Sequence, residues 1–134
     1  MNKTNNVAIL ILTGIAALTI AVGIGRFSYT PILPYMISEL NLTTTEAGLI
    51  ASSNYLGYLL GSLIPIFPQF PKNIRSIFIY SIFISIISLF AMGLTNTFEV
   101  FILIRFIHGI FSAFVLILGT SLIVSHCLLY TSDA

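Results

Sequence analysis

Residues 98–124 read FEVFILIRFIHGIFSAFVLILGTSLIV, and this stretch decides the fold. It is longer than the roughly 20 apolar residues that a helix needs to cross a bilayer core. Inside lipid a helix satisfies its own backbone hydrogen bonds, so the stretch predicts a transmembrane helix. Similar stretches precede it at about 7–36, 45–67 and 75–94. The sequence therefore predicts an all-α, polytopic membrane protein with four transmembrane helices.

Composition supports this class and excludes others. Hydrophobic residues make up 57% of the 134 residues and charged residues only 7%, too few for the charged surface of a soluble domain. The net charge is +1, and no basic cluster indicates a nucleic-acid partner. The expected surroundings are those of a lipid bilayer.

Lysine and arginine in the loops predict the orientation, because positively charged residues stay on the cytoplasmic side. Lys3 precedes the first stretch, and Lys72 and Arg75 lie between the second and third, whereas the loops at 38–44 and 95–97 contain neither residue type. We therefore expect a cytoplasmic N-terminus and a cytoplasmic loop at Lys72 and Arg75. A cleavable signal peptide is the alternative for the N-terminus, but the apolar stretch continues well past its small-residue site at 21–23.

Two glutamates have the spacing of helix caps. Thr43 precedes Glu46 by three residues, and Asn96 precedes Glu99 by three, which is the spacing of a capping box. This pattern favours a structural role for both glutamates over a role in binding or proton transfer.

Small residues predict where the helices touch, because they let backbones approach closely in lipid. The first, second and fourth stretches carry such residues at helical spacing, and the predicted packing positions are Ala21, Gly25, Gly57, Gly61 and Gly109. The third stretch is bulky except for Ser81, Ser85 and Ser88. It is therefore expected to be peripheral and to face lipid.

Arg26 and Arg105 lie within apolar stretches, where an arginine costs roughly 2.5–3.5 kcal/mol and usually faces the bundle interior or a watery cavity. At about 1.5 Å per residue, both fall at a similar depth in the outer half of the membrane. We expect one shared cavity that attracts an anion. The predicted pathway or coupling residues are Arg26, Tyr29, Asn54, Tyr58, Arg105 and His108. The alternative is that each arginine extends to the headgroups or binds helix carbonyls as a structural tie.

The first stretch also has the composition of a broken helix. Gly23 and Gly25 flank the approach to Arg26, and Pro31 and Pro34 each lack a backbone donor. Carbonyl groups freed at such a break can bind a ligand or allow bending. The alternative is that the helix ends there, at the outer interface of the membrane, and that Pro34 marks only this end.

Two blocks in combination resemble a known family. Residues 23–34 (GIGRFSYTPILP) and 47–58 (AGLIASSNYLGY) are similar to the start of a major facilitator superfamily (MFS) transporter of the YbfB/YjiJ type. Residues 105–109 (RFIHG) resemble the superfamily's fourth-helix motif, with His108 where glutamine is common. The resemblance implies a bacterial inner-membrane location and a role for Arg105 in substrate binding or in coupling to a proton. One departure is that residues 61–75 contain no acid, so the aspartate-based latch of that loop is missing.

The resemblance also implies a domain organisation. Residues 1–126 are expected to be the first part of an MFS N-terminal six-helix half, and residues 127–134 to be a non-native tail translated from a sequencing adapter. The expected function is that of a fragment of a secondary active transporter that moves a small, anionic or amphipathic solute by alternating access.

Two other functions compete with this one. A complete four-helix exporter, similar to the small multidrug resistance proteins, needs a membrane-embedded carboxylate in its first helix, and the sequence has none there. A membrane scaffold subunit without transport is the third possibility. An enzyme is not expected, nor is a cofactor or metal, because no catalytic constellation, metal-ligand spacing or glycine-rich phosphate loop is present.

Overall fold

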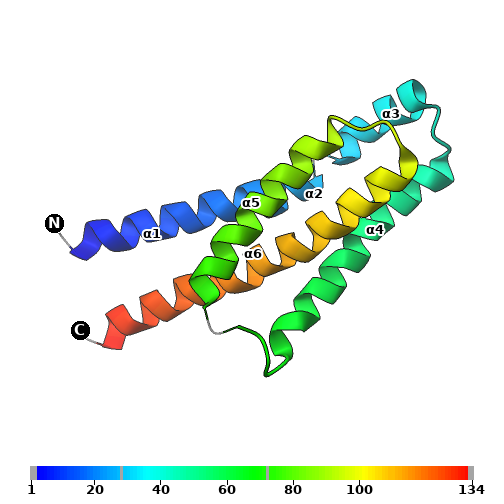
Figure 1. The fold of residues 1–134 in the computed structure, drawn as a ribbon. Helices are drawn as coiled ribbons and strands as arrows, with labels where there is room; N and C mark the ends of the chain where they lie inside the picture. The colour runs from blue at the N-terminus through cyan, green and yellow to red at the C-terminus, as the bar shows by residue number, and fades with distance from the viewer. Residues whose placement is uncertain (1–2, 28, 72, 133–134) are drawn as a thin grey trace.

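The structure is a computed structural model that describes residues 3–27, 29–71 and 73–132, without the side chains at 3–8, 10, 17, 20–22, 26 and 126–132. The described chain is all-α (Figure 1). Its elements are α1 (Lys3–Leu18), the π-helix η1 (Thr19–Ile24), α2 (Gly25–Phe27), α3 (Tyr29–Leu40), α4 (Thr44–Leu63), the 3-10 helix η2 (Ile64–Ile66), α5 (Ile74–Met92) and α6 (Phe98–Ser132).

Among the described residues, three helices are long and apolar enough to cross a membrane: Thr44–Ile66, Ile74–Met92 and Phe98–Ser125. They confirm the second, third and fourth predicted spans to within a few residues. The first predicted span, 7–36, differs because it is not one continuous helix. It is divided among α1, η1, α2 and α3.

The π-helical break in the first span lies at the glycines. The wider π-helical turns of η1 include Gly23 and end directly before Gly25. Pro31 falls in the first turn of α3, where its missing N–H has no intrahelical partner to lose. Pro34 lies inside α3 without ending it. The expected discontinuity is therefore present, and the expectation that Pro34 contributes to it was wrong. The contribution of Pro31 stays a prediction, because residue 28, between α2 and α3, lies outside the described residues.

The predicted capping box at the start of α4 is confirmed. Thr43 Oγ1 accepts a hydrogen bond from the Glu46 N–H (3.2 Å), and Glu46 Oε2 accepts one from the Thr43 N–H (2.7 Å). Helix α6 begins at Phe98, and the Thr97 carbonyl oxygen accepts a hydrogen bond from the Phe101 N–H, which places the N-cap position at Thr97. The prediction of Asn96 as that cap was therefore wrong by one residue.

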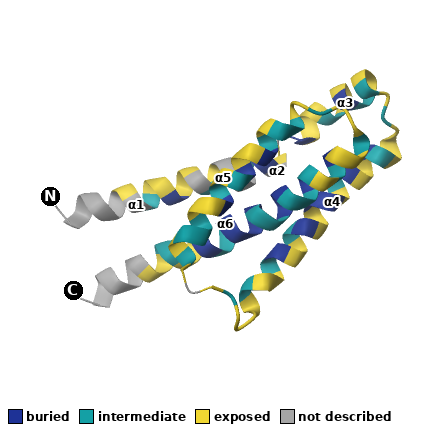
Figure 2. Ribbon diagram, viewed as in Figure 1, coloured by how far each residue is buried: buried dark blue, intermediate teal, exposed yellow. Residues whose placement is uncertain are grey.

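The α4–α6 contact is the closest helix packing described. The buried residues gather on α6 and on the face of α4 that turns toward it (Figure 2). A Cβ atom on Gly57 would collide with the backbone carbonyl of Phe106, and one on Gly61 would lie 2.6 Å from the Ile110 carbonyl oxygen. A Cβ on Gly109 would collide with the Asn54 carbonyl oxygen of α4. Only glycine lets the two backbones approach this closely.

Helix α5 corrects the expected packing order. It packs against α6 more extensively than α1 does, and it also contacts η1 and α2. Its serine stripe is the buried side, with Ser81 and Ser85 fully buried and Ser88 nearly so. Its bulky outer side is exposed, as at Phe83 and Phe90. This side of α5 is the one expected to face lipid.

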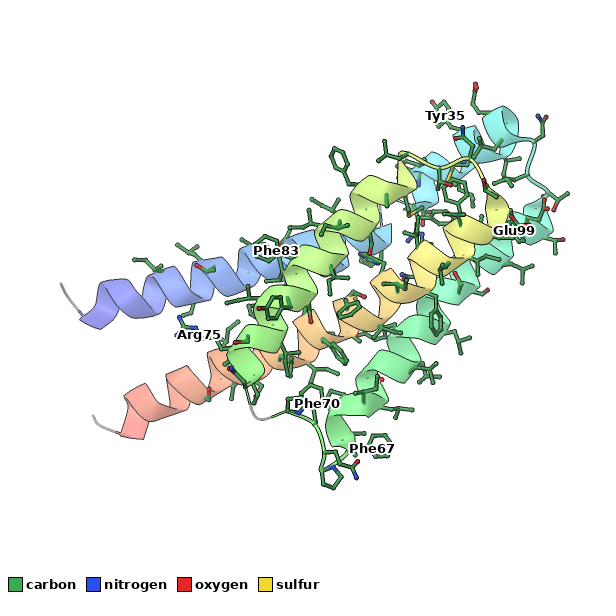
Figure 3. All side chains as sticks on the ribbon, in the orientation of Figure 1. Tyr35, Phe67, Phe70, Arg75, Phe83 and Glu99 are labelled. Atoms are coloured by element: carbon green, nitrogen blue, oxygen red, sulfur yellow. The ribbon has the colours of Figure 1, made fainter. Side chains whose placement is uncertain are left out.

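The bundle has two ends with different loops. The start of α1, the end of α6 and the η2–α5 connection lie toward one end, and the α3–α4 turn and the α5–α6 loop lie at the other (Figure 1). Arg75 is exposed beside the η2–α5 connection, far from Tyr35 and Glu99 at the opposite end (Figure 3). Lys72, predicted for the same loop as Arg75, lies outside the described residues.

Candidate functional site

Arg105 is buried in the bundle, with only 3% of its surface exposed. Its Nη1 donates a hydrogen bond to the Gly25 carbonyl oxygen (3.2 Å), at the end of the π-helical break. Its Cζ lies 3.9 Å from the centroid of the Tyr29 ring, a cation–π contact. Nε has no hydrogen-bond partner in the described part of the chain. The guanidinium is therefore held by a hydrogen bond at Nη1 and by the Tyr29 ring on one face, and its buried Nε–H lacks an acceptor among the described residues.

No carboxylate compensates this charge among the described residues, whose acids are Glu39, Glu46 and Glu99. Glu46 is engaged in the α4 cap. A carbonyl oxygen and an aromatic face stabilise a cation less than a carboxylate does, so Arg105 keeps a net positive potential around it. Such a buried, unpaired cation attracts an anion.

Tyr29 is the fixed support for Arg105. Its side chain is buried, and its hydroxyl donates a hydrogen bond to the Ala47 carbonyl oxygen of α4 (2.9 Å). The ring thus connects the start of α3 to α4 while its face carries the guanidinium. One side chain joins three helices at the level of the arginine.

Asn54 and His108 form a second polar contact between α4 and α6. Asn54 Nδ2 lies 3.0 Å from the Arg105 carbonyl oxygen and 3.1 Å from His108 Nδ1. Because an amide nitrogen only donates, Nδ1 is the acceptor and the neutral imidazole carries its hydrogen on Nε2. His108 is almost fully buried, and its Nε2 has no partner among the residues described. The amide of Asn54 therefore fixes both the backbone at Arg105 and the tautomer of His108.

We expect the substitution Asn54→Ala to lower the free energy of unfolding by about 1–2 kcal/mol, because it leaves His108 Nδ1 buried without a donor. Unfolding by sodium dodecyl sulfate in mixed micelles, followed by circular dichroism, measures the change. Ser52→Ala on the exposed side of α4 is the matched control and should change stability by less than about 0.5 kcal/mol. Equal effects of the two substitutions would contradict a structural role for the Asn54 contact.

A cavity of about 400 Å³ adjoins Arg105. Residues of α3, the C-terminal part of α5, the α5–α6 loop and the first turns of α6 line it. Arg105 and Tyr29 contribute its polar groups beside the tie to Gly25, and Glu39 and Asn96 contribute polar groups near the α3–α4 turn and the α5–α6 loop. The wall between these groups is mostly apolar.

The predicted pathway residues are placed as follows. Tyr29 and Arg105 line the cavity, whereas Asn54, Tyr58 and His108 do not. The side chain of Arg26 lies outside the described residues, although the contact of Arg105 with Gly25 puts the two arginine backbones at a similar depth. Of the predicted packing residues, Gly57, Gly61 and Gly109 lie in the α4–α6 contact and Gly25 is buried at the break, while the side chain of Ala21 is not described.

Sequence reasoning missed several cavity residues, including Met36, Glu39, Met92 and Phe101. Tyr29, Ile32 and Met36 share one face of α3 by their helical spacing, a signal that was available in the sequence. Which helix that face opposes is not visible from spacing, because it depends on how α3 is rotated after the π-helical segment.

The comparisons with known proteins give one family. No curated protein and no solved structure shows a significant similarity to the chain. A family model described as "Uncharacterised MFS-type transporter YbfB" matches residues 18–133, which is most of the chain. The matched region includes the break in the first span, the cavity and Arg105. The chain is therefore an integral membrane protein that belongs to this family of MFS-type transporters, and it is not an enzyme.

Proposed function

We propose that this chain forms the first four spans of the N-terminal half of a secondary transporter, and that Arg105 is the cationic group of its solute pathway. The observation that carries the proposal is a buried guanidinium at the wall of a cavity, with no carboxylate partner among the residues that the structure describes. Family membership supports transport as the activity, and the cavity of about 400 Å³ supports a small solute as the molecule that is moved.

The break in the first span supports an alternating-access mechanism. Arg105 holds the Gly25 carbonyl, directly after the π-helical turns of η1. A solute that takes hydrogen bonds from Arg105 competes with this carbonyl for the same guanidinium. Releasing the tie frees the segment from η1 to α3 to move relative to α6, because π-helical turns are weak points where a helix bends. Solute binding and helix movement are thereby coupled through one side chain.

The loop charges support an orientation with the N-terminus and Arg75 in the cytoplasm of a bacterial cell. The rim of the cavity, near Asn96 and Glu39, then faces the outside. Residues 3–27 and 29–40 are helical, and at about 1.5 Å per residue the first of these two ranges alone is long enough for a fourth span across a core of about 30 Å.

A labelling experiment tests alternating access and does not require the solute to be identified. The complete reading frame that encodes this chain is expressed with every native cysteine replaced by serine, and Met36 in the cavity wall is replaced by cysteine. A membrane-impermeant maleimide is applied to right-side-out and to inverted membrane vesicles. We expect labelling from both sides, because alternating access exposes the cavity to each side in turn.

The matched control is Ile87→Cys, a position on the exposed outer face of α5 away from the cavity. It should react from neither side, because lipid excludes the reagent. Labelling of Met36→Cys from one side only would contradict alternating access, because the cavity would then be open to that side alone.

A further inference from the structure

We propose that the cavity beside Arg105 binds a small monocarboxylate with an apolar body. The carboxylate lies at Arg105, and the apolar body lies between α3 and the C-terminal part of α5. This inference rests on the proposed function, since it names the class of solute that the same site accepts.

The shape of the guanidinium selects a carboxylate. The Gly25 carbonyl oxygen accepts one hydrogen bond from Nη1, and the Tyr29 ring covers one face of the guanidinium. A ligand in the cavity that Arg105 lines therefore meets the N–H groups of the guanidinium edge that these two contacts leave free. The planar guanidinium offers parallel N–H donors to the two oxygens of a carboxylate, which gives a bidentate pair. With no carboxylate of the described chain in that position, the ligand supplies the missing anion.

The walls select the body of the ligand. Ile32, Met36, Leu89, Met92 and Phe101 present apolar surface to the cavity. A sugar would leave hydroxyl groups unpaired against such walls, which costs free energy for each group. Methionine side chains adapt to ligands of different outline, so the walls suit aromatic and branched aliphatic bodies alike.

Charge and volume limit the ligand further. Arg105 is the only cationic side chain that lines the cavity in the described structure, and Glu39 on the same wall repels a second negative charge. A monoanion therefore fits better than a dicarboxylate. The volume of about 400 Å³ lies at the lower end of the range of small-molecule pockets, roughly 300–1,000 Å³.

The test measures binding of radiolabelled 3-phenylpropionate to the purified protein, expressed from its complete reading frame, in phosphatidylcholine nanodiscs by equilibrium dialysis. Unlabelled 3-phenylpropionate should displace the label, and 3-phenylpropanamide should compete at least about tenfold less well, because the neutral amide cannot form the charged pair. Displacement by the amide at the same concentration as by the acid would overturn the proposal. These arms need only the unmodified protein, so they do not depend on how variants fold.

Two pairs of variants locate the site. Arg105→Gln should weaken binding at least about tenfold, whereas Arg75→Gln removes the same charge far from the cavity and should leave binding unchanged. Met92→Trp should block the site by filling it, whereas Ile87→Trp adds the same side chain to the outer face of the same helix without effect. Wild-type binding in either Arg105→Gln or Met92→Trp would place the ligand elsewhere.

An anionic lipid headgroup offers the same charge as the solute, so one arm separates the two sources. The dialysis is repeated in nanodiscs that contain phosphatidylglycerol. Unchanged binding supports a soluble carboxylate, and loss of binding would assign the site to lipid and overturn the proposal. The labelling experiment tests the proposed function separately from this inference. If Met36→Cys is labelled from both sides but 3-phenylpropionate does not bind, the proposed transport function stands and only the monocarboxylate is excluded as its solute.

Discussion

Replacing Gly57 or Gly109 by alanine is expected to destabilise the bundle by about 1–3 kcal/mol in each case, because the added methyl group meets backbone and not a flexible side chain. At Gly57 it meets the Phe106 carbonyl of α6, and at Gly109 it meets the Asn54 carbonyl of α4. Neither carbonyl can rotate away without breaking its own helix. The helices must therefore separate, which also weakens the hydrogen bonds of Asn54 to Arg105 and His108.

The double variant Gly57→Ala/Gly109→Ala gives a sharper result. Both methyl groups push apart the same pair of helices, so the separation forced by one partly accommodates the other. We expect the destabilisation of the double variant to be smaller than the sum of the two single values. Unfolding by sodium dodecyl sulfate in mixed micelles provides all three free energies.

Gly48 provides the matched control on the same helix, since a Cβ there would have nothing within 4 Å. Gly48→Ala should leave stability unchanged or raise it by up to about 1 kcal/mol through helix propensity. Destabilisation by Gly48→Ala equal to that by Gly57→Ala would show that the close α4–α6 contact is not the cause.

The spans and the α4 cap were predictable because they depend on local rules. Lipid requires apolar, self-bonded helices, so the composition of 45–67, 75–94 and 98–124 was sufficient. The Thr43–Glu46 cap depends only on a three-residue spacing, and the structure has both of its hydrogen bonds. Neither feature requires knowledge of which helices are neighbours.

The packing of α5 was less predictable because its bulky residues dominate its composition. Ser81, Ser85 and Ser88 occupy one narrow face, and the structure buries that face. Serine can pack at a helix contact in the way that glycine does, provided that its hydroxyl donates to a carbonyl of its own helix. Ser81 donates to the Ile77 carbonyl oxygen and Ser88 to the Ile84 carbonyl oxygen. The three serines thus indicated which side of α5 packs against the bundle, and its bulky side was correctly predicted to be exposed.

The site was predictable only in part. Arg105 and Tyr29 were identified as charged and aromatic residues within apolar spans, and both line the cavity. Their mutual contact and the tie to Gly25 depend on the π-helical turns at Thr19–Ile24, which rotate everything that follows them. No spacing rule specifies such turns, so the face that α3 presents could not be derived.

Arg105→Ala is expected to lower the initial rate of solute uptake by at least about 30-fold. Removing one partner of a buried, charged hydrogen-bonded pair costs about 2 kcal/mol or more, which corresponds to this factor. The rate is measured in proteoliposomes made with the protein from the complete reading frame, with radiolabelled 3-phenylpropionate and with every other solute that the unmodified protein accumulates. Arg105→Lys keeps the charge but loses the planar donor pair, so its uptake rate should lie between that of the unmodified protein and that of Arg105→Ala. Arg75→Ala, far from the cavity, should transport at the unmodified rate.

A purely structural role of Arg105 predicts a different pattern, because the tie to the Gly25 carbonyl is lost in the same variant. Loss of a tie lowers stability and the amount of folded protein, but it leaves the solute concentration for half-maximal uptake unchanged in the molecules that remain folded. Loss of a pathway cation raises that concentration, and raises it more for anionic than for neutral solutes. If Arg105→Ala lowers stability but leaves the solute concentration for half-maximal uptake unchanged, the role of Arg105 is only to connect the helices.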